Sequence, residues 1–247
     1  MNLDKIYLIN LERRQDRLNH FLDEYKRENI PINKLKIFKA IDAKIHNLSY
    51  TELNMFKNID FDVNSLSGKA CMCNQLSHYN IILDIIKNKY KKCIIFQDDV
   101  RLKNNFKDEI NNVLDNLPKD VEIVWIGLHK IGSGSYFEDF PLNSDYDKYY
   151  VKEKVNDYTC ILNDDINPCS LAYIITYNGA KRYEEYIKRN GFTHATDINF
   201  REYLLSKNIN YGSYNVLCTG NSKFKSDVFE IDDNAIARDM LELLDFN

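Results

Sequence analysis

The pattern of apolar and polar residues along the chain alternates between two periods. Short runs of apolar residues predict buried strands, and longer stretches with an apolar residue at every third or fourth position predict amphipathic helices. Strands are predicted at 5–10, 34–42, 91–100, 121–128, 170–177 and 209–218. Helices are predicted at 11–25, 74–90, 106–117, 180–189 and 197–208, and a further helix starts within 49–56 at an N-cap supplied by Ser49 or Thr51. A turn is predicted at Asn178–Gly179, and a long loop at 129–150.

Strands alternate with helices throughout, which is typical of an open α/β sheet that is mostly parallel and flanked by helices. We find no internal repeat or linker, so the 247 residues are predicted to form a single domain, 1–247. Ligands of such sheets bind outside the carboxyl ends of the strands. Asn10, Asp42, Asp98, Asp99 and the stretch 127–130 all lie at these ends.

The adjacent carboxylates of Asp98 and Asp99 directly follow an apolar run at 93–96 and the polar Gln97. Because an unpaired buried charge is costly, the pair must be solvated, paired with bases or bound to a cation. Carboxylate oxygens hold Mg²⁺ or Mn²⁺, and such an ion can neutralise a diphosphate leaving group. A solvated Asp-Asp turn, or an N-cap of the following helix, explains the same spacing equally well.

Three arginines begin the first predicted helix. Arg13 and Arg17 are four residues apart and would share a helix face, with Arg14 nearby. Together with the free amides of a helix start, they could hold a phosphate group. A solvated charged face, paired with Glu12 and Asp16, is the simpler interpretation of this stretch alone.

Two further motifs carry candidate chemistry. Ser77 and His78 lie on the strongest predicted helix, where His78 could contact a phosphate or a sugar hydroxyl or be a hydrogen-bonded structural residue. Asp197 falls near a predicted helix start, where it could be an N-cap or a general base for an acceptor hydroxyl.

Composition narrows the class of protein. A hydrophobic fraction of 44% allows a packed core, and a net charge of −4 argues against a nucleic-acid-binding protein. The six cysteines form no C-x-x-C pair, which favours free thiols in a reducing compartment over disulfides. The first ten residues lack a basic region and a long apolar stretch, so we expect no signal peptide, no membrane span and a cytoplasmic location.

Taken together, the motifs resemble glycosyltransferase family 25. The opening IYLINLERRQDRL is similar to the signature of that family's first strand, LSHYNII to its S-H helix, and CIIFQDDVRL to its acidic E-D-D motif. FKAIDA, VWIGLHK, SLAYIITYNGAKRY and TDINF follow in the family's order, from about residue 5 to residue 205. SHYN, LAYIIT and the late KSD at 225–227 resemble the procollagen branch more closely than the bacterial one.

The resemblance implies a GT-A-like fold with a nucleotide-binding half at 1–100 and an acceptor-side half at 101–247. It implies Mn²⁺ (or Mg²⁺) as cofactor and a UDP-sugar as donor. The implied donor-binding residues are Asn10, Leu11, Arg13, Arg17, Ala40, Asp42, Ser77, His78 and Asp98, the implied metal ligands are Asp99 and Asp98, and the implied catalytic residues are Asp197 and Asp98. The loop at 130–160 could close over the donor.

The implied activity is transfer of galactose or glucose from a UDP-sugar to hydroxylysine or galactosyl-hydroxylysine of a collagen-like protein. A glycan acceptor, as in lipooligosaccharide galactosyltransferases, is an alternative with the same chemistry. Gln97 stands where the family has Glu, and no late histidine is evident as a metal ligand, which favours a non-catalytic sugar-nucleotide binder. A Mg²⁺-dependent phosphohydrolase also stays open, and a homodimer is one candidate assembly.

Overall fold

The computed structural model describes residues 1–57, 59, 61–128, 150–164, 166, 169–221, 223–224 and 226–227. The predicted loop at 129–150, which includes Lys130, therefore lies almost wholly outside the described residues, and so does Lys225 of the KSD motif.

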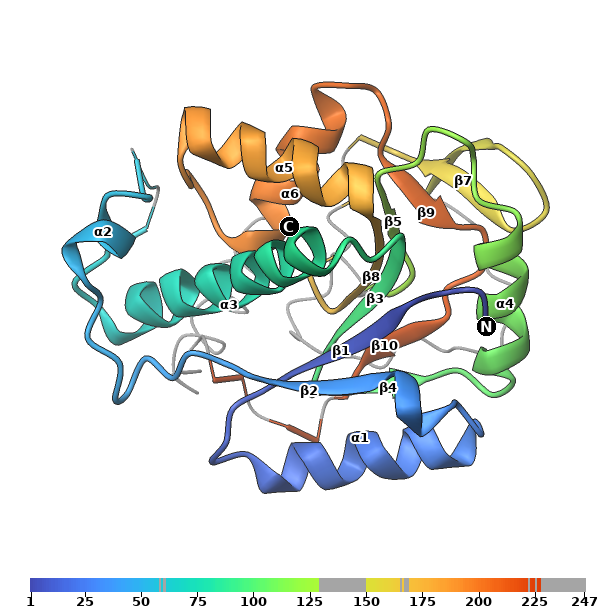
Figure 1. Ribbon diagram of the computed structural model, residues 1–247, viewed down its shortest axis with the longest axis horizontal. Helices are drawn as coiled ribbons and strands as arrows, with labels where there is room; N and C mark the ends of the chain where they lie inside the picture. Colours follow the sequence, from blue (N-terminus) through green and yellow to red (C-terminus); the bar gives the residue numbers. More distant parts are fainter. Residues whose placement is uncertain are drawn as a thin grey trace, which may run out of the picture.

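An eight-stranded sheet forms the centre of the molecule, in the order β2-β1-β3-β8-β5-β9-β7-β6 (Figure 1). Its strands are β1 (Lys5–Asn10), β2 (Leu35–Lys39), β3 (Lys92–Gln97), β5 (Ile123–Trp125), β6 (Val151–Lys154), β7 (Thr159–Leu162), β8 (Ala172–Thr176) and β9 (Tyr211–Ser213). A second, antiparallel sheet pairs β4 (Val100–Leu102) with β10 (Cys218–Gly220).

Six of these eight strands run in one direction. Strands β2, β1 and β3 are parallel neighbours, as are β5 and β9. Strand β8 lies antiparallel between β3 and β5, and β7 lies antiparallel between β9 and β6. The prediction of an α/β fold with an open, mostly parallel sheet is therefore confirmed.

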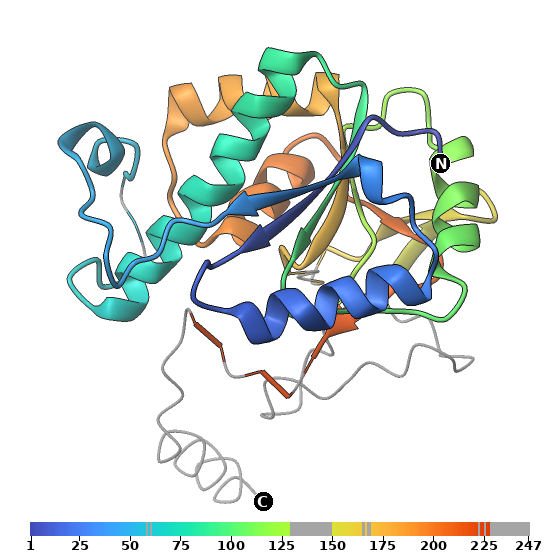
Figure 2. The same ribbon diagram turned by 60° about the horizontal axis from the view of Figure 1, so that its bottom comes forward.

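Helices cover both faces of the sheet (Figures 1 and 2). They are α1 (Gln15–Arg27), α2 (Tyr50–Leu53), α3 (Leu66–Asn88), α4 (Phe106–Asp115), α5 (Tyr177–Asn190) and α6 (Thr196–Leu205), with a 3₁₀ turn at Ile32–Lys34. Residues of α3, α5 and α6 pack against one face and residues of α1 and α4 against the other. Strand β1 serves both cores, because Tyr7 and Ile9 point to the first and Ile6 and Leu8 to the second.

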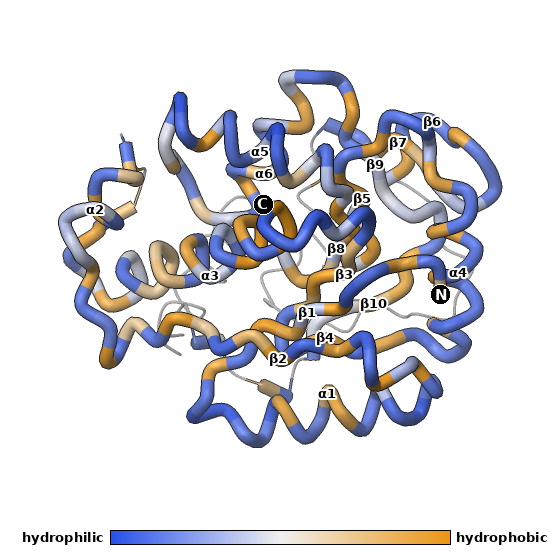
Figure 3. The backbone as a smooth tube through the Cα atoms, viewed as in Figure 1, coloured by the Kyte–Doolittle hydropathy of each residue, from blue (hydrophilic) through white to orange (hydrophobic). Residues whose placement is uncertain are grey.

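Hydropathy follows these layers. The central strands are hydrophobic and the connecting loops are largely hydrophilic (Figure 3). Ser49 caps α2 in a capping box with Glu52, which confirms one of the two predicted caps. Helix α3 begins at Leu66 with Ser65 as N-cap, eight residues before the predicted start at 74.

Two predicted features are wrong. Asn178 and Gly179 form no turn but lie in the first turn of α5, where Thr176 accepts a hydrogen bond from the Gly179 amide. A Cβ at Gly179 would lie 2.3 Å from the Glu122 carbonyl oxygen, so the glycine serves close packing there. The single strand predicted at 209–218 is divided between β9 and β10, which belong to different sheets.

All six cysteines are free thiols; five are buried and Cys169 is partly exposed. This confirms the prediction of free thiols, while the compartment stays a prediction.

Within the described ranges, no helix has both the length and the apolar content that a membrane crossing requires. The single-domain boundary and its division at residue 100 also stay predictions.

Candidate functional site

The carboxyl ends of the three parallel strands β2, β1 and β3 bring the predicted polar residues together at one edge of the sheet. Asn10 ends β1, and its Nδ2 donates to Asp98 Oδ2 at 2.7 Å and to the Arg14 carbonyl at 3.2 Å. Asp98 directly follows β3, so this hydrogen bond ties the ends of two adjacent strands. Asn10 is buried and engages its amide within the protein, which favours a scaffolding role; its role in donor binding stays a prediction.

Arg17 pairs with both residues of the acidic pair. Its Nη1 donates to Asp98 Oδ1 at 2.9 Å and to Asp99 Oδ2 at 3.1 Å. The side chains of Arg17 and Asp98 are 6% and 7% exposed, and that of Asp99 is 20% exposed. Of the three options for a carboxylate pair at a strand end, pairing with a base is therefore realised for both residues, and cation binding stays a prediction.

The two carboxylates differ in how fully they are satisfied. Both oxygens of Asp98 accept hydrogen bonds, from Arg17 and from Asn10. Asp99 Oδ1 is buried and has no hydrogen-bond partner among the described residues. Burial and repulsion from Asp99 raise the pKa of Asp98 to about 6, against the opposing effect of Arg17 and Asn10. One arginine thus leaves this pair short of positive charge.

Asp227 joins the arginines from the far end of the chain. Arg13 Nη1 donates to Asp227 Oδ1 at 2.7 Å, Arg14 Nη1 donates to Oδ2, and Arg17 Nη2 lies 3.2 Å from Oδ2. The prediction that Arg13 and Arg17 share a helix face is wrong, because α1 begins at Gln15 and Arg13 precedes it. The arginines converge through a shared carboxylate, Asp227, which the sequence does not predict as a site residue although it belongs to the KSD motif.

The residues leading to Asp227 lie beside α1 (Figure 2). The Asn221 amide donates to the Asp99 carbonyl at 2.7 Å, which ties this segment to the acidic pair. The Phe224 ring lies 5.7 Å from the guanidinium carbons of both Arg14 and Arg17. These contacts keep the end of the described chain at the carboxyl edge of the sheet.

The segment after β2 forms another wall of this edge. Arg13 Nε donates to Asp42 Oδ2 at 2.7 Å, and the Ala40 amide donates to the Asn10 carbonyl at 2.9 Å. Leu11, Ala40 and Asp42 are partly exposed, so the structure leaves them accessible. Their predicted contact with the nucleotide is untested.

Ser77 and His78 lie behind this edge, in the core. Ser77 is fully buried; its hydroxyl accepts from the Ile41 amide at 2.9 Å and so positions the segment after β2. His78 is 1% exposed, and its Nδ1 lies 2.8 Å from the Tyr173 hydroxyl. Burial lowers the pKa of His78 to about 3, so the imidazole is neutral and supplies no charge for a phosphate. This placement favours a structural role, and ligand contact by either residue stays a prediction.

Asp197 lies in the first turn of α6, whose N-cap is Ala195. The N-cap interpretation of Asp197 is therefore wrong. Burial raises the pKa of the Cys169 thiol, and the negative charges of Asp197 and Asp99 raise it further. Both carboxylates therefore act on the same thiol, which lies on the segment just before β8, so Asp197 and Asp99 belong to one electrostatic neighbourhood.

The residues at this edge offer few ligands for a divalent cation. The described part of the chain contains no group of three or more His, Cys, Asp or Glu side chains that could hold a metal ion. The unpartnered Asp99 Oδ1 is one suitable ligand. Mg²⁺ and similar ions are commonly held by one or two carboxylates, with substrate phosphates and water as the other ligands. The arrangement fits that mode, and the metal stays a prediction.

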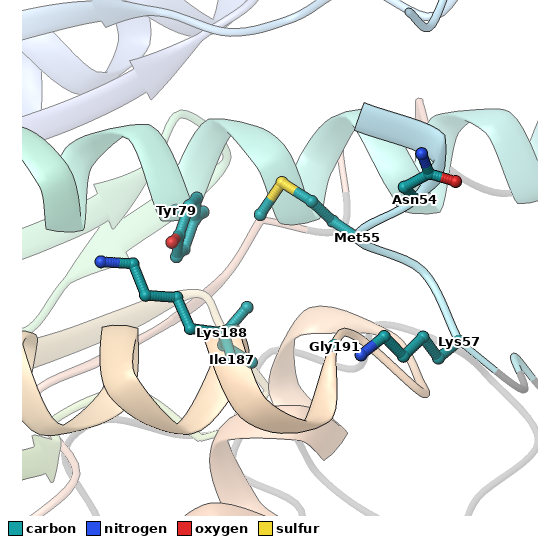
Figure 4. Close-up of a pocket in the computed structure, with 7 residues that line it drawn as sticks. All are labelled: Asn54, Met55, Lys57, Tyr79, Ile187, Lys188 and Gly191. Atoms are coloured by element: carbon teal, nitrogen blue, oxygen red, sulfur yellow. The ribbon is translucent and has the colours of Figure 1, made fainter. Parts of the chain in front are cut away.

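A separate pocket of about 320 Å³ lies between the segment after α2 and the helices α3 and α5 (Figure 4). Its lining residues are Asn54, Met55, Lys57, Tyr79, Ile187, Lys188 and Gly191. None of these residues was predicted as a site residue, and the lining lacks the acidic pair and its arginines. We therefore place the candidate site at the carboxyl edge of the sheet and not in this pocket.

Comparisons with known proteins agree on one family. The sequence model of Glycosyltransferase family 25 (LPS biosynthesis protein) matches residues 3–199. Procollagen galactosyltransferase 2 of Homo sapiens is 25% identical over 192 residues, which are 74% of this chain and 27% of that protein. Probable inactive glycosyltransferase 25 family member 3 of Bos taurus is 22% identical over 138 residues, which are 53% of this chain and 23% of that protein.

A solved structure is similar at a lower level. The apo form of mouse xyloside xylosyltransferase 1 shares 10% identity at a TM-score of 0.40, covering 81% of this chain and 69% of that one. The chain spans about a quarter of the length of the two curated relatives above. Because the family model matches most of the chain, the chain belongs to glycosyltransferase family 25.

Proposed function

We propose that the protein is a metal-dependent glycosyltransferase that moves galactose or glucose from a UDP-sugar to hydroxylysine, or to galactosyl-hydroxylysine, of a collagen-like protein. Family membership supports the class of reaction, and the relative named procollagen galactosyltransferase 2 supports the acceptor. The observation that carries the metal dependence is Asp99 Oδ1, a buried oxygen without a partner among the described residues, beside an arginine cluster.

Accessible residues at the edge of the sheet would bind the donor. Leu11, Ala40 and Asp42 would border the uridine, while Asn10 and Ser77 hold that wall in place from behind. Arg13 is the more exposed of the predicted phosphate ligands, at 34% against 6% for Arg17, so Arg13 would offset the charge that develops on UDP.

Asp99 would supply the protein ligand of the cation. A bound Mn²⁺ or Mg²⁺ would neutralise the diphosphate as the sugar leaves. Asp98 would hold Arg17 through one oxygen and Asn10 through the other, which supports an indirect role better than direct coordination. Its predicted contact with ribose or sugar is kept as a proposal.

Asp197 would act on the acceptor. Its partly exposed carboxylate shares a neighbourhood with Asp99, which supports placing the acceptor hydroxyl between the donor and α6. As a general base it would take the proton of that hydroxyl during direct displacement with inversion. If the product is an α-linked glucose, inversion is excluded because the donor is also α-linked, and this role of Asp197 is then wrong.

The test is a panel of UDP-sugars, each with and without a collagen-like peptide and Mn²⁺, read by released UDP. We expect UDP release that needs both the peptide and the metal, and that is strong with UDP-galactose or UDP-glucose only. Release without acceptor at a comparable rate would indicate a phosphohydrolase and would contradict the proposal.

Two alternatives rest on specific observations. The family description names LPS biosynthesis, so an oligosaccharide acceptor belongs in the same panel. The probable inactive relative, together with Gln97 in place of the family's Glu, favours a non-catalytic UDP-sugar binder. That alternative predicts UDP binding without turnover at any Mn²⁺ concentration.

A further inference from the structure

One guanidinium group, that of Arg17, joins three carboxylates from two separate parts of the chain. Arg17 lies in the first turn of α1, whereas Asp98 and Asp99 follow β3, and Asp227 lies near the end of the described residues. The Nη1 atom serves both members of the acidic pair, and Nη2 lies 3.2 Å from Asp227 Oδ2. Arg17 therefore sits at the centre of the charge network.

The burial of Arg17 argues against direct contact with a phosphate. Its side chain is 6% exposed, and both of its terminal nitrogens already face carboxylate oxygens. An incoming anion would have to displace those carboxylates in the core, whereas Arg13, which also pairs with Asp42 and Asp227, is 34% exposed. The resemblance that suggested Arg17 as a phosphate ligand does not match this geometry.

We propose that Arg17 is a positioning residue, which holds Asp99 through Oδ2 and leaves Oδ1 to a divalent cation. The proposal rests on the function proposed above. Asn10, Asp98, Arg17 and Asp99 form a continuous chain of hydrogen bonds, so the end of β1 fixes Asp98, Asp98 fixes Arg17, and Arg17 fixes Asp99. Without the guanidinium, the adjacent carboxylates would repel each other and Asp99 would lose its fixed orientation.

The geometry of the guanidinium explains why lysine cannot replace it. Arginine presents its donors in a rigid planar fork, whereas lysine presents a compact charge on a flexible stem. An Arg17→Lys variant keeps the positive charge but loses the ability to hold three carboxylates at fixed positions. The charge and the positioning effect can therefore be separated by one substitution.

The test measures binding, not only activity. Mn²⁺ is titrated into protein saturated with UDP, and free Mn²⁺ is read by electron paramagnetic resonance. We expect Mn²⁺ affinity to fall by about 10–100-fold in Arg17→Lys, the range typical when a residue that orients a metal ligand is lost. UDP affinity, measured by calorimetry in EDTA, should change by less than about twofold, because the proposal gives Arg17 no phosphate contact.

Arg27→Lys is the matched control. Arg27 lies on the same helix and donates to the Leu102 carbonyl at 2.7 Å, with no contact to the acidic pair. Its substitution should leave both affinities unchanged. If Arg17→Lys does not fold, the double variant Arg17→Met/Asp98→Asn removes opposite charges together, and the same loss of Mn²⁺ affinity is expected.

The outcomes separate the two proposals. If the wild-type protein binds both ligands and Arg17→Lys keeps its Mn²⁺ affinity, the positioning role is wrong while the proposed function stands. A loss of metal-free UDP affinity of more than about fivefold in Arg17→Lys would make Arg17 a donor ligand instead. If the wild-type protein binds neither UDP nor Mn²⁺, the proposed function fails and the positioning role falls with it.

Discussion

Two clusters of charged residues lie at opposite edges of the sheet, and they differ in charge balance. Glu122 directly precedes β5 and is 2% exposed. It lies at the edge where the six strands of common direction begin, opposite the carboxyl edge. Arg182 donates to it at 2.5 Å, Lys207 lies 3.0 and 3.1 Å from its two oxygens, and the Tyr203 hydroxyl donates as well. Two cations and a hydroxyl thus satisfy one carboxylate.

The cluster at the carboxyl edge contains more carboxylates than cationic side chains. Its ion pairs join three arginines (Arg13, Arg14 and Arg17) to five carboxylates (Asp16, Asp42, Asp98, Asp99 and Asp227). Burial alone would raise the pKa of Glu122, but its hydrogen bonds outweigh burial, so this pKa is lowered. The pKa of Asp98 is instead raised to about 6. A satisfied cluster stabilises the fold, and a cluster with surplus negative charge is where a cation can bind.

The largest expected effect follows from removing the unsatisfied carboxylate. Asp99→Ala should lower Mn²⁺-dependent transfer by about 10³-fold, because metal charge stabilisation contributes several kcal/mol to the transition state. The melting temperature should not fall, since the substitution relieves repulsion with Asp98. Enzyme assays and calorimetry check the two expectations, with Asp16→Ala as a control in the same network. Near-normal transfer by Asp99→Ala would rule out the metal role.

Removing the cations of the satisfied cluster should damage the fold instead. The double variant Arg182→Met/Lys207→Met leaves Glu122 buried without a cation, and we expect a loss of about 3–5 kcal/mol in the free energy of unfolding. Urea denaturation measures this loss. Transfer per folded molecule should stay near the wild-type value, and a selective loss of transfer would show that the two clusters are coupled.

The free energy of unfolding should depend on pH through the ionisation of Glu122. The folded state lowers the pKa of Glu122 below its ordinary value of 4.5, so the folded protein binds fewer protons there than the unfolded chain. The stabilisation that ionised Glu122 gives to the folded state is therefore present above pH 4.5. It is lost as the pH falls through the lowered pKa of Glu122. Glu122→Gln should therefore cost about 1.5–3 kcal/mol at pH 6 and less at pH 3.5. A pH-independent difference between the variant and the wild type would contradict this account.

The smallest effect is expected at the exposed rim of the acidic cluster. Asp16 pairs with Arg14 at 2.7 Å, but its side chain is 54% exposed. Asp16→Ala should cost less than about 1 kcal/mol in urea denaturation, because exposed ion pairs contribute little. A larger cost would mean that Asp16 holds Arg14 in place for Asp227.

Much of the fold was predictable because it depends on local pattern. The runs that form β1 and β3 and the period that forms α1 need no distant information, and Ser49 caps its helix through neighbours three residues away. The hydrophobic pattern gave wrong predictions where tertiary packing determines the secondary structure. Gly179 lies in the first turn of α5 and packs against the Glu122 backbone, and the stretch 209–218 divides between two sheets.

The sequence by itself determined that two carboxylates follow a buried strand at the edge where α/β proteins bind ligands. Only the tertiary structure decided which charges meet them. Arg14 and Asp227 are 213 positions apart, and Asn10 and Asp98 are 88 apart, so no local spacing encodes their contact. Coulomb interactions depend on distance in the folded chain, and that distance is set by the register of β1 against β3 and by the packing of α1.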